Sequence, residues 1–333
     1  MQQTTSAAGT ARAPRFARRR DWERDPVGHG MYTATAFGPD GLLYAFGGGR
    51  PGDPGIAARV VGYDRDGRIV RAWGEQAFVG TRPHGITITG DGAVYLVEDV
   101  GCRVRRFTLD GREQAVLGPS GEENRSDTGV DWERPGLRER LAMIRPEGAG
   151  PFNHPTALAV GPDGGLYVTD GYGNCKVHRF GADGAYLSSW GRSGTRPGEF
   201  HLPHAITADG DRLLVCDREN GRVQVFGFDG AYRDAWAGLH RPENVAIGPD
   251  GLYYVAEGYE PPGYESFSRA HPPSKQGSAP RITVRDADGI KVGQIDLDFR
   301  VHHVAVDGDG NLYCCPSTAE ADSRIVRFDR VGW

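Results

Sequence analysis

The chain has 333 residues, a net charge of −5 at neutral pH and no long apolar run, and it contains 50 glycines and 22 prolines. A slightly acidic chain has no general electrostatic attraction to nucleic acid or to a membrane surface, so we expect neither as a partner. Glycine and proline at this level, without a long amphipathic helical pattern, favour an all-β fold with many turns.

The N-terminal segment is locally basic and contains one short candidate strand. We expect residues 1–13 to form a flexible tail and residues 14–333 to form a single domain. A strand within residues 14–23 would supply the missing outer strand of the last repeat and cover an exposed sheet edge.

A repeat then occurs six times along the chain. Each copy begins with apolar alternation, reaches a glycine-containing turn and continues with an apolar strand that usually carries a tyrosine. The copies are TATAFGPDGLLY (33–44), HGITITGDGAVY (84–95), TALAVGPDGGLY (156–167), HAITADGDRLLV (204–215), NVAIGPDGLYY (244–254) and HHVAVDGDGNLY (302–313). Most copies are followed by a second hairpin, so each unit is predicted to be a four-stranded antiparallel sheet.

Six four-stranded units in one chain predict a six-bladed β-propeller. The expected blades are 32–75, 84–118, 154–191, 203–238, 243–296 and 301–333. Long connections at 119–152 and 257–280 interrupt the pattern, and loops of this length in a compact domain are often functional. Trp73, Trp190 and Trp236 end the fourth strands of three units, where we expect them to pack between neighbouring sheets.

Alternate copies of the repeat begin with histidine, at His84, His204 and His302. Alternate blades in a ring of six are one third of a turn apart, so these imidazoles should converge on the axis. Three converging imidazoles with a vacant fourth position are typical of a catalytic metal site. A single histidine at a strand start is more often a packing residue, but the threefold pattern favours ligation.

Three motifs, DGYGN (170–174), LPHAI (202–206) and DRENGRVQVF (217–226), carry a family resemblance. Together with NHL-type repeats they resemble the peptidyl-α-hydroxyglycine α-amidating lyase family, most strongly over residues 82–236. The resemblance implies a six-bladed propeller that holds zinc through three histidines. It also implies cleavage of the N–Cα bond of a C-terminal α-hydroxyglycine, which releases a peptide amide and glyoxylate.

The resemblance also assigns individual residues. The zinc ligands of the family fall on the three repeat histidines, its active-site tyrosine on Tyr172, and its two arginines on Arg218 and Arg50. Tyr172 beside a metal and arginines could serve as a base, whereas the arginines could instead hold a substrate carboxylate. Taken without the family, Tyr172 equally fits a packing residue and Arg218 an ion pair with Asp217.

One position departs from the family pattern. The family has an aspartate directly after the third histidine, where it serves a structural calcium ion, and this chain has His303. Because calcium prefers oxygen ligands, we do not expect the Ca²⁺ site to carry over. Strand alternation predicts that His303 points away from His302, so we expect it to support a metal ligand or to have a structural role rather than to bind the metal itself.

The cysteines indicate the compartment. The chain has five, two of them adjacent, and no CxxC pair, while Gly173 and Val225 stand where the family has disulfide cysteines. We expect free, buried thiols and, with no apolar leader segment, a cytoplasmic location.

The resulting functional hypothesis is a Zn²⁺-dependent lyase, or one that uses another divalent transition metal. It would act as a monomer on a small-molecule or peptide-terminal substrate bearing a carboxylate, and release a carbonyl product such as glyoxylate. Two alternatives stay open: a non-catalytic NHL propeller that binds a protein or ligand on its rim, and a metal-dependent hydrolase resembling a lactonase. Lactonase-type propellers usually bind calcium through carboxylates and asparagine, which makes the hydrolase the weaker alternative.

Overall fold

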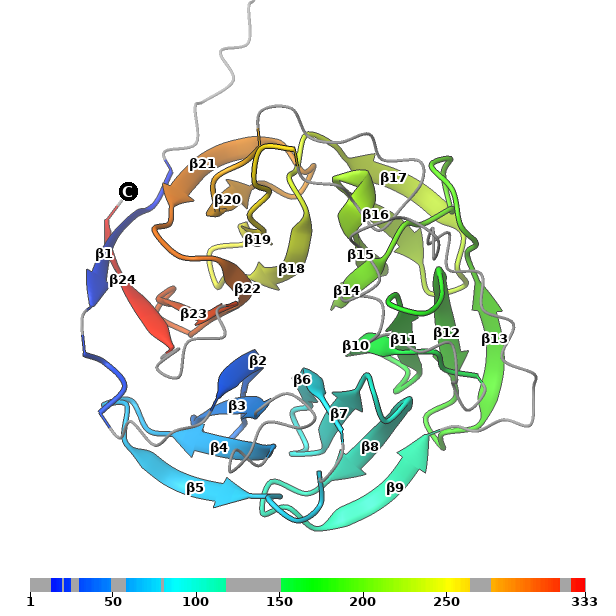
Figure 1. Ribbon diagram of the computed structural model, residues 1–333, viewed down its shortest axis with the longest axis horizontal. Helices are drawn as coiled ribbons and strands as arrows, with labels where there is room; N and C mark the ends of the chain where they lie inside the picture. The colour runs from blue at the N-terminus through cyan, green and yellow to red at the C-terminus, as the bar shows by residue number, and fades with distance from the viewer. Residues whose placement is uncertain are drawn as a thin grey trace, which may run out of the picture.

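The computed structural model describes residues 13–19, 21–24, 30–48, 58–78, 81–117, 151–263, 277–317 and 325–332. The strands form six antiparallel sheets of four strands each, arranged as blades around a central axis (Figure 1). The predicted six-bladed β-propeller is therefore confirmed.

The first three blades each use four strands that are consecutive in the chain. From the axis outward they are β2 (Met31–Phe37), β3 (Leu43–Gly48), β4 (Arg59–Tyr63) and β5 (Ile69–Trp73) in blade 1, β6 (Pro83–Ile88), β7 (Val94–Glu98), β8 (Arg103–Phe107) and β9 (Glu113–Leu117) in blade 2, and β10 (Pro155–Val160), β11 (Leu166–Asp170), β12 (Lys176–Phe180) and β13 (Tyr186–Trp190) in blade 3.

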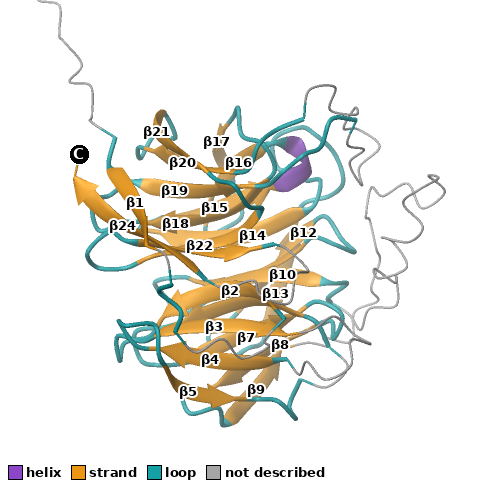
Figure 2. Cartoon of the chain, turned by 60° about the vertical axis from the view of Figure 1, so that its left-hand side comes forward, coloured by secondary structure: helices purple, strands orange, loops and turns teal. Residues whose placement is uncertain are grey.

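Blades 4 and 5 follow the same order. They are β14 (Pro203–Asp209), β15 (Arg212–Asp217), β16 (Arg222–Gly227) and β17 (Tyr232–Trp236), then β18 (Pro242–Ile247), β19 (Tyr253–Glu257), β20 (Arg281–Arg285) and β21 (Lys291–Asp296). A short 3-10 helix, η1 (Arg218–Asn220), joins β15 to β16 and lies on one face of the ring, as the turned view in Figure 2 shows.

Blade 6 combines strands from the two ends of the described chain. Its inner strands are β22 (Val301–Val306), β23 (Leu312–Pro316) and β24 (Val326–Gly332), and its outer strand is β1 (Arg15–Arg19). β1 pairs antiparallel with β24, so that Ala17 faces Asp329 (Figure 1). The prediction that the N-terminal segment closes the last blade is confirmed.

The Asp-Gly pairs of the repeat close the first hairpin of each blade. Gly41 and Gly164 have φ values of 78° and 79°, a backbone conformation that favours glycine. In blade 3 the carboxylate of Asp163 accepts a hydrogen bond from the backbone N–H of Gly165 at 3.0 Å. These local contacts explain why the pattern recurs with such regular strand lengths.

The buried apolar residues form six clusters, one at each interface between neighbouring blades. The tryptophans at the outer strands contribute as predicted. Their ring centroids lie 5.1 Å from Phe107 for Trp73, 6.0 Å from Phe226 for Trp190 and 5.1 Å from Tyr253 for Trp236. The core therefore lies between the blades, which leaves the axis available for polar side chains.

We expect Trp236→Ala to lower the free energy of unfolding by about 3–5 kcal/mol, because it removes a buried aromatic ring from the interface of blades 4 and 5. Urea denaturation measures this change. Leu187→Ala is the control, since its side chain in β13 is 54% exposed and the change should stay within about 0.5 kcal/mol. Equal losses in the two variants would contradict this account of the core.

Several sequence predictions concern segments that the structure describes only in part. Residues 1–12 of the predicted tail, 119–150 of the first long connection and 264–276 of the second lie outside the described residues. All five cysteines are described and all are buried, as predicted. Among the described residues, no helix has the length and hydropathy needed to span a bilayer.

Candidate metal centre

Each innermost strand has an irregularity in its pairing near its first residues, which leaves one residue unpaired with the second strand. In all six blades the pairing between the first and second strands shifts by one residue near its start. The residues skipped in the pairing are Thr33, His84, Thr156, His204, Glu243 and His302. Such β-bulges re-aim a side chain, and here they do so at the same place in every blade.

The structure corrects the register predicted for the fifth copy. The residue equivalent to the histidines is Glu243, not Asn244. The signal was present in the sequence, because Tyr254 lies eleven residues after Glu243, the spacing that most other copies keep. Asn244 instead joins two blades: its amide donates to the carbonyl oxygen of Val304 and accepts from the Val304 N–H, both at 2.9 Å.

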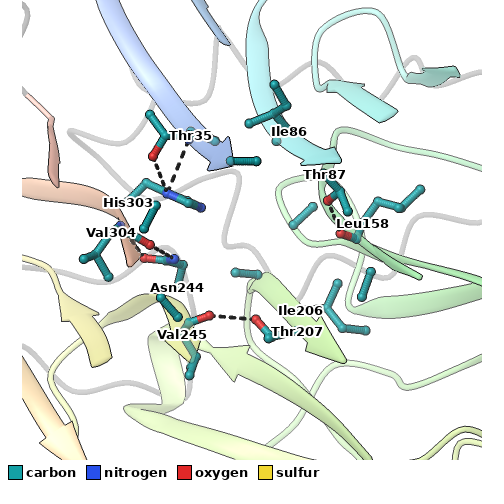
Figure 3. Close-up of a pocket in the computed structure, with 18 of the residues that line it drawn as sticks. Thr35, Ile86, Thr87, Leu158, Ile206, Thr207, Asn244, Val245, His303 and Val304 are labelled. Carbon is teal, nitrogen blue, oxygen red and sulfur yellow. Dashed lines mark hydrogen bonds between the residues drawn. The ribbon is translucent and has the colours of Figure 1, made fainter. Parts of the chain in front are cut away.

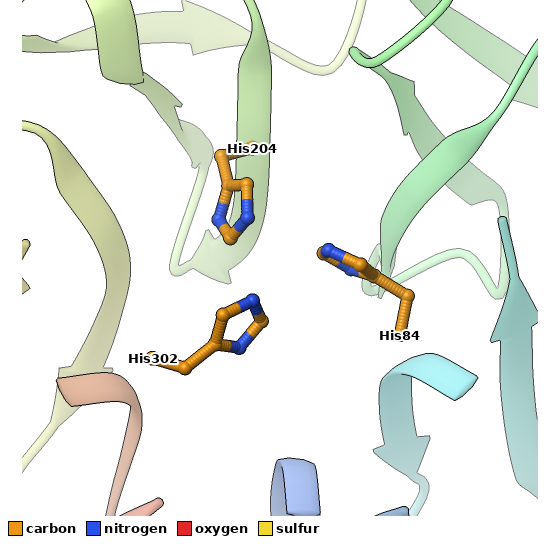
Figure 4. Close-up of side chains that lie close together, drawn as sticks. All are labelled: His84, His204 and His302. Atoms are coloured by element: carbon orange, nitrogen blue, oxygen red, sulfur yellow. The ribbon is translucent and has the colours of Figure 1, made fainter. Parts of the chain in front are cut away.

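The three repeat histidines meet at the axis (Figure 4). His84, His204 and His302 are buried, their ring centroids lie 4.9–5.1 Å apart, and one nitrogen from each ring lies within 4.8 Å of the others. Within the described ranges, this is the only group of three or more histidine, cysteine or acidic side chains arranged to hold a metal ion.

The Nδ1 atom of each histidine faces a backbone carbonyl of the next blade. The carbonyl oxygens belong to Thr156, Glu243 and Thr33, at 2.6, 2.8 and 2.6 Å from His84, His204 and His302 respectively. A carbonyl can only accept, so Nδ1 carries the proton and Nε2 presents a lone pair. The bulged residue of one blade thus orients the histidine of the preceding blade, as outer-shell carbonyls do at metal sites.

Burial favours the neutral form of all three histidines. Burial lowers the pKa of His84 and His204 well below the usual range for histidine, and the positive charge of Arg218 lowers both values further. Burial also lowers the pKa of His302. Neutral imidazole is the form that binds a metal, so three lone pairs on one axis fit zinc or another divalent transition metal.

Tyr172 lies directly beside this cluster. Its hydroxyl is 3.1 Å from Nε2 of His84 and 3.2 Å from Nε2 of His204. The loop between β11 and β12 holds it there: the buried carboxylate of Asp170 accepts from the Asn153 N–H at 2.9 Å, and the Gly173 N–H donates to the Asn153 carbonyl, also at 2.9 Å. The structure thus brings together four of the predicted site residues.

Two guanidinium groups accompany Tyr172. Those of Arg218, in η1, and Arg82, just before β6, lie 5.6 and 5.2 Å from the centre of its ring. Burial raises the pKa of the Tyr172 phenol, whereas the charges of Arg218 and Arg82 act to lower it. Arg218 was predicted from the sequence and Arg82 was not, while Arg50 lies outside the described residues.

Glu243 connects the histidine cluster to Arg218. Its Oε2 is 3.2 Å from Nδ1 of His204 and accepts from Nη1 of Arg218 at 3.3 Å. Glu219 accepts from Nε of the same arginine at 3.1 Å and also pairs with Arg241. Glu243 is therefore a functional candidate that the sequence interpretation missed because of the register error.

We expect Glu243→Gln to weaken zinc binding roughly tenfold, the low end of outer-shell effects, because the backbone carbonyl that orients His204 remains. Competition with a chromophoric chelator measures the dissociation constant. Thr33→Ser is the matched control, since it changes the equivalent bulged residue beside His302. If the Glu243 variant keeps the wild-type zinc affinity, the carboxylate does not help His204 to bind the metal.

A channel extends from the histidine cluster along the inner strands. Its cavity of about 580 Å³ is lined mainly by small and apolar side chains, with Thr87, Thr207 and Asn244 already bonded to neighbouring strands (Figure 3). His303 also lines this channel, 3.4 Å from Oγ1 of Thr35, because the bulge at His302 interrupts the alternation expected from the sequence. Burial lowers the pKa of His303 to about 3, so the imidazole is neutral.

Comparison with known proteins adds sequence relationships to this geometry. The NHL repeat family model matches residues 152–180 and 200–226. The chain is 31% identical over 159 residues to peptidyl-glycine alpha-amidating monooxygenase B of Xenopus laevis, and 30% identical over 159 residues to a Caenorhabditis elegans protein named "probable peptidyl-alpha-hydroxyglycine alpha-amidating lyase". Each match covers 46% of this chain, and the matched segment spans 16% and 39% of the two relatives.

Solved structures share the architecture. A streptogramin B lyase superimposes with a TM-score of 0.56 over 94% of this chain and 97% of its own, at 12% sequence identity, which supports a common fold alone. The repeats, the closed ring of blades and the sequence matches agree with one another. The chain is a six-bladed β-propeller with NHL repeats, and over slightly less than half of its length it is similar in sequence to proteins named as peptidyl-glycine alpha-amidating monooxygenase and probable peptidyl-alpha-hydroxyglycine alpha-amidating lyase.

Proposed function

We propose that this protein is a zinc-dependent lyase that breaks the C–N bond of an α-hydroxyglycine or a related hemiaminal bearing a carboxylate. The observation that carries the proposal is the convergence of three unprotonated Nε2 atoms beside the hydroxyl of Tyr172. The lyase names of the sequence relatives support the same class of reaction.

The three histidines would hold the metal through Nε2, and zinc bound there supplies a Lewis acid that acidifies a coordinated hydroxyl. Their Nδ1–H groups remain bonded to backbone carbonyls, so the rings keep their orientation during turnover. The three histidines are buried, and a buried site strengthens electrostatic interactions with the substrate.

Tyr172 would move the proton. The substrate N–CH(OH)–COO⁻ must lose its hydroxyl proton, form a carbonyl and transfer the electrons of the C–N bond to nitrogen. The phenolate of Tyr172 accepts the hydroxyl proton and returns it to the departing nitrogen, so that the products are an N–H compound and glyoxylate. The positive charges of Arg218 and Arg82 favour the phenolate and oppose the effect of burial.

The test is product formation by the purified protein with its metal content measured. We expect incubation with α-hydroxyhippurate to yield glyoxylate and benzamide in equal amounts. Removal of the metal with a chelator should abolish both products, and added zinc should restore them. A fully metal-loaded protein that forms no glyoxylate would exclude this substrate class.

A further inference from the structure

The two arginines beside Tyr172 differ in the number of carboxylates that pair with them. Arg218 is engaged by two carboxylates, with Nε bonded to Glu219 and Nη1 to Glu243. Arg82 is engaged by one carboxylate, because both Nε and Nη2 donate to the same oxygen of Asp99. Within the described residues, Nη1 of Arg82 has no acceptor.

The two arginine side chains also differ in their exposure to solvent. The side chain of Arg218 is 5% exposed, whereas that of Arg82 is 19% exposed although its partner Asp99 is fully buried. Asp99 therefore fixes the edge of the Arg82 guanidinium that carries Nε and Nη2, while the side chain as a whole stays partly exposed. A group held in this way loses little conformational freedom when it binds a ligand.

We propose that Arg82, rather than Arg218, binds the substrate carboxylate through Nη1. The inference rests on the proposed function and defines its substrate as one with a free carboxylate. Arg82 lies two residues before His84 and 5.2 Å from the centre of the Tyr172 ring, so a carboxylate on Nη1 is held next to both the metal ligand and the proposed base. Arg218, held by Glu219 and Glu243, positions Tyr172 instead.

The charge of the ligand makes the proposal testable without turnover. Hippurate and hippuramide have the same shape and lack the reactive hydroxyl, but only hippurate carries a carboxylate. Calorimetric titration of the metal-loaded protein should show tighter binding of hippurate. Arg82→Lys should weaken hippurate binding at least about tenfold and leave hippuramide binding unchanged, because charge-assisted guanidinium–carboxylate bonds are lost.

Two further variants control for misfolding and for general effects of replacing an arginine. The double variant R82Q/D99N removes both charges together and avoids a buried unpaired carboxylate, so it should fold and show the same loss for hippurate. Arg300→Lys is the matched control: Arg300 lies two residues before His302, as Arg82 does before His84, but contacts the ring of Tyr259. It should bind hippurate within about twofold of wild type.

Two outcomes would overturn the assignment: unchanged hippurate affinity in both Arg82 variants, or no preference of the wild-type protein for hippurate over hippuramide. Failure of the proposed function is a separate result. A protein that releases no glyoxylate from α-hydroxyhippurate, yet binds hippurate through Arg82, would have the carboxylate site and a different reaction.

Discussion

Replacement of His204 with alanine is expected to remove the bound metal and to lower turnover of α-hydroxyhippurate roughly a thousandfold or more. Only two imidazole nitrogens would remain, and a Lewis acid supplies several kcal/mol of transition-state stabilisation. His204 is the informative ligand because it also contacts Tyr172 and Glu243. Elemental analysis of the purified variant, together with initial rates of glyoxylate release, measures both effects.

His303→Ala is the control for this experiment. His303 is adjacent to a proposed ligand in sequence but lies outside the three-histidine cluster. Its variant should retain about one metal ion per chain and most of the activity. A His204→Ala protein with full metal content and a wild-type rate of glyoxylate release would reject His204 as a metal ligand. The non-catalytic propeller would be favoured instead by a wild-type protein that releases no glyoxylate and tolerates substitutions at all three histidines.

Tyr172→Phe should retain the metal and lose most of the catalytic rate. The substitution deletes one oxygen and keeps the ring that the two arginines contact, so the fold and the three-histidine cluster remain. Loss of a general base typically costs about 10²- to 10⁴-fold, and we expect kcat to fall in this range with a much smaller change in KM. Steady-state kinetics on zinc-loaded protein provides both constants.

Tyr259→Phe is the matched control for the hydroxyl. Tyr259 lies two residues after the end of β19, as Tyr172 lies two residues after the end of β11, but its ring faces Arg300 rather than the histidines. This variant should keep the wild-type kcat. Unchanged turnover in Tyr172→Phe would reject the tyrosine as the proton carrier and leave the metal site unaffected.

The fold was predictable because its determinants are local and repeated. Asp-Gly turns such as that at Gly164 recur in every unit, and alternation of apolar residues defines the strands between them. The role of β1 was predictable for a different reason. The last unit lacked a strand, and an unpaired sheet edge is a strong physical constraint.

Site residues could be predicted from the sequence where their position in the repeat alone determines their place in the fold. His84, His204 and His302 converge because each occupies the same bulge in alternate blades. Glu243 was missed because hydrophobic alternation does not mark a bulge, so an error of one residue was invisible in the pattern. His303 was misplaced by the same irregularity.

Arg82 could not be found from the sequence, because its significance arises only in three dimensions. It is one of several arginines that lie two residues before a bulged position, as Arg241 and Arg300 also do. Its contact with Tyr172 depends on the junction between blades 2 and 3, and its orientation depends on Asp99. Neither contact produces a periodic pattern in the sequence.

The pairing of β1 with β24 affects the order of events during synthesis. β1 is made before every other described strand, and its partner is made last. At the usual rates of translation, roughly 15 to 60 seconds separate the two. The five complete blades can form while the chain grows, but β1 must wait for β24. The ring therefore closes only after β24 has been made, and the three-histidine cluster, which needs His302 from the same blade, is completed at that stage.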